Sequence, residues 1–409
     1  MSQFHFYNQL ARRILHRENG RLAKPIVRLS MFGVSLGITI MLIALGVTSG
    51  YKSIIQEKVV AMGQHISISH YDNNYSYEQI PIAFNDTLSE TLRTVPEIIA
   101  IQPFATKVGI IKTTDQVEGV VLKGVDKAFD GVAFSKNLIE GDTLQLDDST
   151  TNNNIIISKK LSEKLKLKLG DKARLYFVQD PPRQRSFTIT GIYETGMPEF
   201  DSKFAIVDLK HVQKLNDWSP QQVGGVEILT SDYDKIDEVG EKLHHTIDIN
   251  LKAETIKQKY PEIFDWIALF DTNVSVLLII TTIVCMITML SVFFVIILEQ
   301  TPLIGTLKTL GMRTAGIVKT FIIVAGYTLA RGLLAGNVIA LGLGWLQQKF
   351  HIVKLNPDTY YINYVPIKFD VLNVLLLNLG VFIACLLVLV VPAWFVSKKI
   401  SPVKSLRFE

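Results

Sequence analysis

Cysteine is nearly absent from this chain. Among 409 residues it has two cysteines, Cys285 and Cys385, and both fall inside long apolar stretches. No disulfide framework is therefore available to the polar part of the chain, and the lack of Cys-x-x-Cys or paired His/Cys spacing argues against a structural zinc ion. The polar part must fold around a hydrophobic core of its own.

Common catalytic and nucleotide-binding motifs are missing as well. The nearest approach to a phosphate-binding loop, residues 119–124, is followed by Val125 where the motif requires lysine. His244 and His245 are adjacent and point to different sides of a helix, which argues against a shared metal ion. The chain also has no zinc-protease motif, nucleophile elbow or credible triad spacing. We expect no catalytic residue, no metal site and no cofactor bound by this chain.

Four long apolar stretches are the most informative feature that is present. A bilayer needs about 20 apolar residues per spanning helix. The stretch 274–298 carries no ionisable group except the thiol of Cys285, and the others are 30–48, 317–346 and 371–396. A cleaved signal peptide is the alternative for the first stretch, but the other three would still anchor the product. The sequence predicts a polytopic α-helical membrane protein with four transmembrane helices and a large α+β periplasmic domain between helices one and two.

Basic residues set the expected orientation. They crowd the segment before the first stretch, follow the last one, and recur between the second and third as Lys308, Arg313 and Lys319. The positive-inside rule places these regions, and both termini, in the cytoplasm of a bacterial inner-membrane protein. The net charge of +4 then reflects topology and anchoring at lipid headgroups, so we expect no nucleic-acid partner.

The order of segments follows from these assignments. Residues 1–28 form a cytoplasmic amphipathic segment that lies along the membrane or packs against another subunit. The four spans cover residues 29–50, 272–298, 317–346 and 371–396. The segments between and after them are a periplasmic domain at 51–271, a cytoplasmic loop at 299–316, a periplasmic loop at 347–370 and a cytoplasmic tail at 397–409.

The periplasmic domain is expected to have a stalk helix at each end. A helical pattern continues from the first span to Gly63, and another leads from Tyr260 into the second span. Between them we expect strands at 65–69 and within 99–124, broken at Gly109 and Asp115, and helices at 86–94 and 232–245. A β-rich block inserted at about 134–229 should hold strands at 154–157, 172–178, 186–193 and 204–208 and a helix at 158–167 that ends at Gly170. Two stalks entering one domain could carry movement between them.

A short helix is predicted in the cytoplasmic loop at 299–316. Thr301 is a suitable cap, Pro302 suits the first helical position, and Gly311 suits the left-handed residue that ends the helix. Its apolar residues are more numerous than a simple turn requires, which favours a docking element over an ordinary connector. These residues are Leu303, Ile304, Leu307 and Leu310.

Two polar residues, Arg331 and Asn337, interrupt the third span. A charged group inside a membrane is costly and by default functional. It can also be a structural group that bonds backbone carbonyls or, here, Asn378. Glycine and alanine residues on the same helix allow close helix packing and carry no information about a substrate.

At this point the chain resembles the permease subunits of lipoprotein-releasing (LolC/LolE-like) ABC transporters, within the wider group of macrolide-efflux (MacB-like) and cell-division (FtsX-like) permeases. The segment EQTPLIGTLKTLG at 299–311 resembles the coupling helix of that family. The ending, from Pro392 and Ala393 to PVKSLRFE at 402–409, resembles its fourth helix and tail. Further matching segments are 169–172, 191–201, 355–361 and 365–366.

The resemblance implies a set of partners and roles. A second permease chain, identical or paralogous, and two copies of a separate ATPase that binds ATP and Mg would complete the complex, which would move lipoproteins from the outer leaflet of the inner membrane toward a periplasmic chaperone. The implied ATPase-coupling residues are Glu299, Pro302, Ile304, Leu307, Lys308 and Gly311. The implied lipid path includes Leu36, Ile40, Ile43 and Val47. A chaperone-recruiting loop would correspond to residues 178–186, with Pro181, Pro182, Arg183 and Arg185, for which a plain hairpin turn is the alternative.

Two other functions fit the same outline. A mechanical signalling permease would use cytoplasmic ATP hydrolysis to bend the periplasmic domain onto another protein. An efflux permease would work with outer-membrane partners, although such chains usually carry a fused ATPase or a differently built domain.

Overall fold

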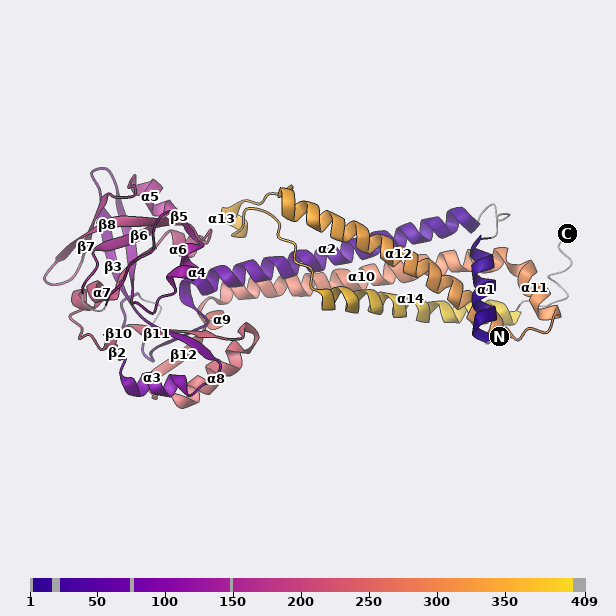
Figure 1. Ribbon diagram of the computed structural model, residues 1–409, viewed down its shortest axis with the longest axis horizontal. Coiled ribbons are helices and arrows are strands. Elements are labelled where there is room, and N and C mark those ends of the chain that lie inside the picture. Colours follow the sequence, from indigo (N-terminus) through magenta and orange to yellow (C-terminus); the bar gives the residue numbers. More distant parts are fainter. Residues whose placement is uncertain (1–2, 17–22, 74–76, 148–149, 400–409) are drawn as a thin grey trace. The chain divides into compact units, whose positions relative to one another are not determined.

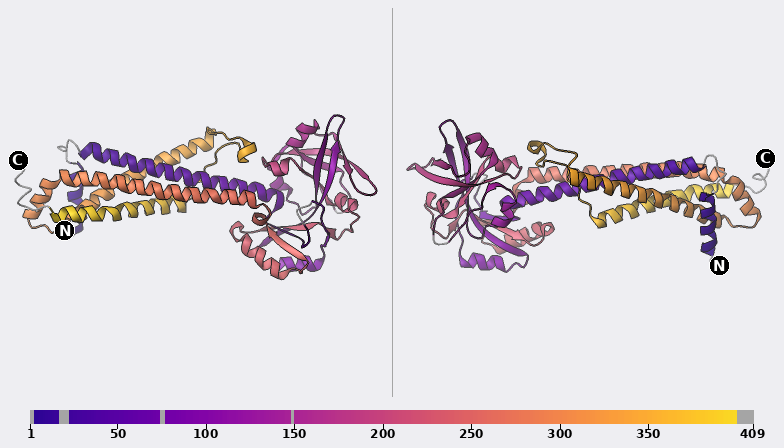
Figure 2. Two further views of the ribbon diagram at one scale, coloured as in Figure 1. Left: turned by 180° about the vertical axis from the view of Figure 1, so that it is seen from behind. Right: turned by 45° about the horizontal axis from the view of Figure 1, so that its top comes forward.

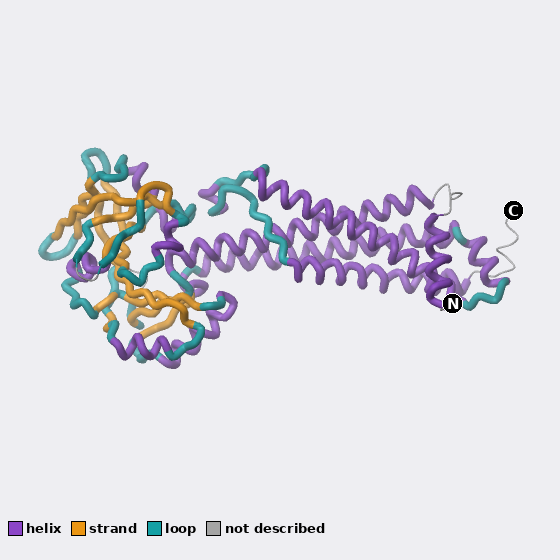
Figure 3. Tube along the Cα trace, viewed as in Figure 1, coloured by secondary structure: helices purple, strands orange, loops and turns teal. Residues whose placement is uncertain are grey.

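The computed structural model describes residues 3–16, 23–73, 77–147 and 150–399, and the chain divides into two compact units (Figure 1). The first, here the helical unit, contains residues 1–52, 266–354 and 364–409. The second, here the α/β unit, contains residues 53–265 and 355–363. Figure 3 shows the difference in secondary structure: the strands, in orange, all lie within residues 66–255, and the long helices are purple.

Within the described residues, four helices are long and apolar enough to cross a membrane. They are α2 (Ala23–Gly63), α10 (Pro261–Glu299), α12 (Thr314–Phe350) and α14 (Val371–Lys399). Each contains one of the four predicted apolar stretches, so the predicted fold class is confirmed. The shorter helices of this unit are α1 (Gln3–His16) and α11 (Thr301–Thr309).

Two of the four helices, α2 and α10, have residues in both units. Helix α2 continues to Gly63 and α10 begins at Pro261, so each runs without interruption from the helical unit into the α/β unit. Where they leave the apolar region, the ring of Tyr51 packs on Trp266 and Phe270, with centroids 5.4 and 5.3 Å apart. The helical extensions on both sides of the domain were predicted from the sequence.

The four helices pack at short range because small residues lie at their contacts. A Cβ atom at Gly336 of α12 would lie 2.7 Å from the Ser35 carbonyl oxygen of α2, and one at Gly37 would overlap the Cys285 sulfur of α10. Glycine is therefore needed at both places. Helix α1 packs on α12 and crosses the bundle near its end, as the two views in Figure 2 also show.

The α/β unit is built around one ten-stranded sheet. Its strands are β1 (Ile66–His70), β3 (Ile98–Lys112), β4 (Val117–Val125), β5 (Leu138–Gly141), β6 (Asn154–Ser158), β7 (Lys172–Phe177), β8 (Arg183–Tyr193), β9 (Phe204–Asp208), β11 (Gly225–Thr230) and β12 (Leu251–Thr255), and a separate ribbon joins β2 (Ile82–Ala83) to β10 (Gln222–Val223). The helices are α3 (Asp86–Arg93), α4 (Gly131–Ser135), α5 (Lys159–Leu165), α6 (Pro198–Asp201), α7 (Leu209–Leu215), η1 (Tyr233–Lys235), α8 (Ile236–Thr246), α9 (Ile256–Lys259) and α13 (Pro357–Tyr360).

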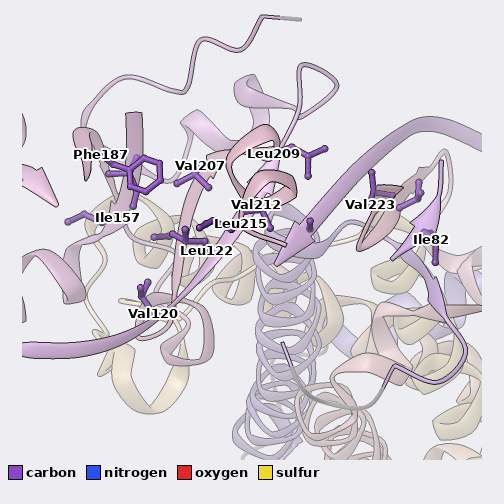
Figure 4. Close-up of a cluster of buried hydrophobic side chains, with 14 of the residues drawn as sticks. Ile82, Val120, Leu122, Ile157, Phe187, Val207, Leu209, Val212, Leu215 and Val223 are labelled. Atoms are coloured by element: carbon purple, nitrogen blue, oxygen red, sulfur yellow. The ribbon is translucent and has the colours of Figure 1, made fainter. Parts of the chain in front are cut away.

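The strand order is β12-β1-β11-β3-β4-β9-β6-β8-β5, and β7 pairs with both β3 and β8. The pairings from β3 through β4, β9, β6, β8 and β7 therefore return to β3 and form a closed ring. Strand β9 runs parallel to β4, and β8 runs parallel to β6. Figure 4 shows part of the core, where Leu122, Ile157, Phe187 and Val207 come from four strands of this ring.

Three expectations about this unit are corrected. Gly109 does not break a strand: β3 runs through it, and the glycine makes room for the Phe177 ring, 2.8 Å from where a Cβ would stand. The chain turns at 113–116, as expected at Asp115, through a bond from the Thr113 amide to the Gln116 carbonyl. Helix α5 ends at Leu165, not near Gly170, because Lys166 adopts the left-handed conformation (φ 55°).

The third correction concerns the inserted block expected at about 134–229. Strand β11 pairs with β1 and β3, so residues from 225 onward belong with the first strand of the domain. The block also shares one continuous sheet with the rest of the unit, because β9 pairs with β4.

Candidate functional site

Helix α11 lies between α10 and α12 and ends as predicted, with Gly311 in the left-handed region (φ 85°). Its start differs from the prediction. Gln300 occupies the cap position and Thr301 is the first helical residue, whose hydroxyl donates back to the Ile297 carbonyl oxygen at 3.4 Å. Thr301 therefore does not cap the helix.

The two faces of α11 have different environments. Ile304 is fully buried in the core of the helical unit, so it is not available to a partner. Pro302 and Thr306 are exposed, Leu307 and Lys308 are half-buried, and Leu310 is 79% exposed. The surface that α11 offers is therefore smaller than the sequence suggested and is centred on Leu310 and its neighbours.

Glu299, immediately before α11, has an unusual environment. Its Oε2 atom is buried and has no hydrogen-bond partner among the described residues. A buried carboxylate oxygen without a donor is costly. Glu299 can therefore accept a further hydrogen bond at the junction of α10 and α11.

The predicted lipid-path residues divide into two pairs on α2. Leu36 and Ile40 are 50% and 43% exposed. Ile43 and Val47 are half-buried, and Ile43 packs against the core of the helical unit. The structure therefore leaves one apolar strip of α2, at Leu36 and Ile40, uncovered by this chain.

A cavity of about 490 Å³ lies between α2, α10 and α14 in the helical unit. Its polar lining includes Lys52 and Asp271, whose Nζ and Oδ2 atoms are 2.6 Å apart. Its apolar lining includes Leu45, Leu278 and Leu377. The volume is within the range of small-molecule sites, and the mixture of charge and hydrocarbon suits an amphiphile. The sequence prediction missed this ion pair, although both charges stand just beyond apolar stretches.

The hairpin between β7 and β8 is tighter than the loop expected at 178–186. Strand β8 already begins at Arg183, so Arg183 and Arg185 are strand residues, and the turn itself contains Val178, Pro181 and Pro182. Arg183 is bound to its own domain: it donates to both carboxylate oxygens of Asp217, each at 2.7 Å, and to the Lys214 carbonyl oxygen. Arg185 is half-buried and donates to the Gln184 carbonyl oxygen at 3.2 Å, while Val178 is 87% exposed.

The polar residues of the third span have separate environments. Asn337 and Asn378 exchange side-chain hydrogen bonds of 2.7 and 3.1 Å and so connect α12 to α14. Asn378 is thus the partner of Asn337 and not of Arg331. Arg331 is exposed on α12, one turn from Tyr327, whose hydroxyl donates to Asn8 of α1 at 2.8 Å.

The order of these elements agrees with comparisons to known protein families. The MacB-like periplasmic core domain matches residues 28–246, and the FtsX-like permease C-terminal domain matches residues 275–400. The chain is a LolC/LolE-like permease of the FtsX/MacB superfamily. The first domain match begins within α2 and ends with α8, and the second begins within α10 and continues through α11, α12 and α14.

Similarity to individual relatives of this permease extends over nearly the whole chain. It is 22% identical to the lipoprotein-releasing system transmembrane protein LolC of Xylella fastidiosa (strain 9a5c), over 96% of each chain. It is 21% identical to LolE of Haemophilus influenzae, over 92% of this chain and 94% of that one. Among solved structures, the periplasmic region of MacB from Actinobacillus actinomycetemcomitans aligns with 50% of this chain and 95% of that one, at 14% identity and a TM-score of 0.35.

Proposed function

We propose that this permease is the membrane subunit of an ABC transporter that extracts lipoproteins from the outer leaflet of the bacterial inner membrane. The observation that carries the proposal is the similarity to lipoprotein-releasing permeases along nearly the full chain. The two helices that run from the helical unit into the α/β unit support it, since they offer a rigid route for movement. Both termini would be cytoplasmic and the α/β unit periplasmic.

The energy would come from a separate ATPase that binds ATP and Mg, in two copies beside two permease chains. Helix α11 is the proposed contact, through the exposed Pro302 and Leu310 and the half-buried Leu307 and Lys308. Glu299 would accept a hydrogen bond from the ATPase or from a neighbouring basic segment, which would remove the cost of its unpaired oxygen. Gly311 would set the angle at which α12 leaves the contact.

The lipid path would use two regions of α2. The exposed strip at Leu36 and Ile40 would contact acyl chains, with Ile43 and Val47 behind it. The cavity beside Lys52 and Asp271 lies on another face of the same helix, and its ion pair would meet the polar end of an amphiphile. Hydrocarbon contacts with charges at the rim are what extraction of an acylated protein requires.

A periplasmic chaperone would receive the released lipoprotein. The β7–β8 hairpin presents an exposed Val178 beside the half-buried Arg185, which is compatible with such a contact, while Arg183 holds the hairpin to Asp217. Val178 and Arg185 would therefore contact the chaperone, and Arg183 would support the hairpin.

The test is photo-crosslinking in the assembled complex. A photoreactive residue at Ile40 should capture a lipoprotein, whereas the same group at Ile38, which is fully buried two positions away, should capture permease helices. ATP hydrolysis by the complex confirms that each variant is assembled. If Ile40 captures only permease helices or phospholipid in an active complex, the lipoprotein function is wrong and mechanical signalling through the stalks takes its place.

A further inference from the structure

A segment between α12 and α14 belongs to the α/β unit. Residues 355–363, which include α13, group with that unit by their contacts, whereas residues 354 and 364 on either side belong to the helical unit. This segment and residues 191–201 are both matching segments of the family resemblance, and neither has a role in the proposed function. The structure brings the two together.

The contact is made by Lys58 of α2. Its ammonium donates a hydrogen bond of 2.7 Å to the carbonyl oxygen of Tyr361. Tyr361 has a φ of 60°, a conformation that residues other than glycine rarely adopt unless their surroundings enforce it. Its hydroxyl also reaches Glu199 of α6, 3.4 Å away. Tyr361 is thus held from its backbone and from its side chain.

The receiving surface is a turn at Gly196, where φ is 71°. A Cβ atom on Gly196 would lie 2.7 Å from Lys58 Nζ and 3.3 Å from the Tyr361 carbonyl oxygen, so glycine allows both to approach. The buried Asp201 fixes this turn by accepting bonds from the Thr195 amide (3.0 Å), the Thr195 hydroxyl (2.8 Å) and the Gly196 amide (2.8 Å). Its carboxylate also attracts the ammonium of Lys58.

The other end of the segment is attached to α12. The Gln347 side chain of α12 is buried; its amide donates to the carbonyl oxygens of Val353 and Val365, each at 3.0 Å, and its oxygen accepts from the Val353 amide at 2.9 Å. Beyond Gln347, residues 353–355 pair with residues 363–365 as a short antiparallel ladder. The pairs are Val353–Val365, Lys354–Tyr364 and Leu355–Asn363. A loop whose arms are hydrogen-bonded to each other is stiffer than an open one of the same length.

We propose that residues 353–365 are a third mechanical connection, in addition to the two stalk helices, which transmits movement of α12 and α14 to the α/β unit through Lys58. Gln347 holds the base of this connection, and Lys58 is a positioning residue that holds its tip against the Gly196 turn. The inference rests on the proposed coupling of the permease to ATP hydrolysis. The connection stays docked throughout the ATP-hydrolysis cycle, because it can transmit movement only while it is held stiffly at both ends.

The first experiment measures docking. Lys58→Met keeps the hydrocarbon stem and removes the donor, and loss of a hydrogen bond to a charged group should raise deuterium uptake at residues 359–363 by about tenfold or more in rate. The matched control is Lys164→Met, which removes a lysine paired with Glu118 elsewhere in the same unit. Unchanged uptake in Lys58→Met overturns the assignment of Lys58.

The second experiment separates transmission from folding. Glu199→Cys and Tyr361→Cys, joined by a short bismaleimide, replace the lost contact covalently, while the native Cys285 and Cys385 are buried in the spans. In the complex with its ATPase, Lys58→Met should hydrolyse ATP but release less lipoprotein per ATP, and the cross-link should restore release. Failure of the cross-link to restore it, or loss of release when the otherwise wild-type protein is cross-linked, overturns the proposal.

A readout without cargo distinguishes this inference from the proposed function. A fluorescent label on the α/β unit should respond to ATP in the wild-type complex, respond less in Lys58→Met, and recover when cross-linked. If the label behaves in this way but the wild-type complex releases no lipoprotein, the mechanical connection is supported and the proposed lipoprotein function is wrong.

Discussion

The ammonium of Lys123 lies 2.7 and 2.8 Å from the two carboxylate oxygens of Glu227, in the interior of the α/β unit. Their side chains are only 7% and 5% exposed. Lys123 comes from β4 and Glu227 from β11, and both strands flank β3, so the ion pair bridges across the intervening strand. The ring of Phe104 on β3 lies beneath, with Lys123 and Lys259 5.6 and 5.7 Å from its centre.

Replacing one member of this ion pair should destabilise the α/β unit more than replacing both. Glu227→Gln removes the carboxylate charge beside the buried Lys123 ammonium and should cost about 3–5 kcal/mol, whereas Lys123→Met with Glu227→Gln should cost less. The exposed pair Lys159–Glu194 is the control, since Lys159→Met should cost roughly 0–1 kcal/mol. Hydrogen exchange of the strands of the α/β unit in the full chain measures the differences. Equal costs for Glu227→Gln and Lys159→Met would show that the buried pair is not desolvated.

Two glycines of α12 form a matched pair for testing helix packing. Gly336→Ala should separate α2 from α12, because the new Cβ would lie 2.7 Å from the Ser35 carbonyl oxygen and would disturb the Thr39 hydroxyl that donates to the Gly336 carbonyl oxygen. In Gly342→Ala the new Cβ would have no neighbouring atom within 4 Å, so this substitution should be neutral or should stabilise the helix. Thermal unfolding in detergent checks the ranking. A Gly336→Ala variant as stable as Gly342→Ala contradicts the close contact.

The Asn337–Asn378 pair should contribute modestly to the helical unit. Interhelical hydrogen bonds of this kind are worth roughly 0.6 kcal/mol on average and seldom above about 2 kcal/mol. A double-mutant cycle with Asn337→Leu and Asn378→Leu should show coupling of that size. Thr288→Val is the control, since its hydroxyl bonds only the Val284 carbonyl oxygen of its own helix among the described contacts. Zero coupling would mean that the two amides do not pair in the folded protein.

His65 should make the α/β unit sensitive to acid. Burial lowers the pKa of His65 below its ordinary value of 6.5, and its Nδ1 accepts from the Thr230 amide at 3.0 Å. A lowered folded-state pKa means that the unfolded chain takes up the proton first. The stability that neutral His65 contributes is therefore present above pH 6.5 and is lost as the pH falls from there through the folded-state pKa.

His65→Asn should reduce this pH dependence, because the amide oxygen can still accept from Thr230 and does not titrate. Hydrogen exchange of β1 and β11, compared at pH 7 and pH 5 after correction for intrinsic rates, measures it. The same change in protection for wild type and variant would assign the acid sensitivity to other groups.

Helix α11 should tolerate changes differently on its two faces. Leu307→Ala with Leu310→Ala should weaken binding of the ATPase while leaving the permease folded, and Lys308→Ala added to them should weaken it further. Ile304→Ala removes a fully buried side chain and should destabilise the helical unit by about 2–5 kcal/mol. Pull-down of the ATPase and thermal unfolding together separate these outcomes. If the variant with Leu307→Ala and Leu310→Ala binds the ATPase as well as the wild type does, the docking assignment is wrong.

The sequence predicted those parts of the fold that depend on neighbouring residues. Long apolar runs specify spanning helices by composition, and Gly311 marks a helix end because few other residues adopt its φ. The prediction at Gly109 failed because an internal glycine can mark a turn or a close packing contact, and only the position of Phe177 decides between them.

Other parts depend on contacts that no local pattern encodes. Lys123 lies where β4 is buried on both faces, so alternation does not mark it as internal. Ile304 is an apolar residue in the predicted docking helix, and the sequence does not show whether such a residue packs against a partner or against the other helices of its own chain. The contact of Tyr361 with Lys58 joins residues more than three hundred positions apart.

The position of β12 has a consequence for biogenesis. Strand β1 ends at His70, and its partners β11 and β12 end at Thr230 and Thr255. At roughly 5–20 residues per second, a ribosome needs on the order of 10 to 40 seconds to supply them after β1 has emerged. In the orientation proposed above, β1 would stand in the periplasm during that interval with both of its edges unpaired. An unpaired strand edge can pair with other chains, so the nascent protein would be open to aggregation there until its second span is made.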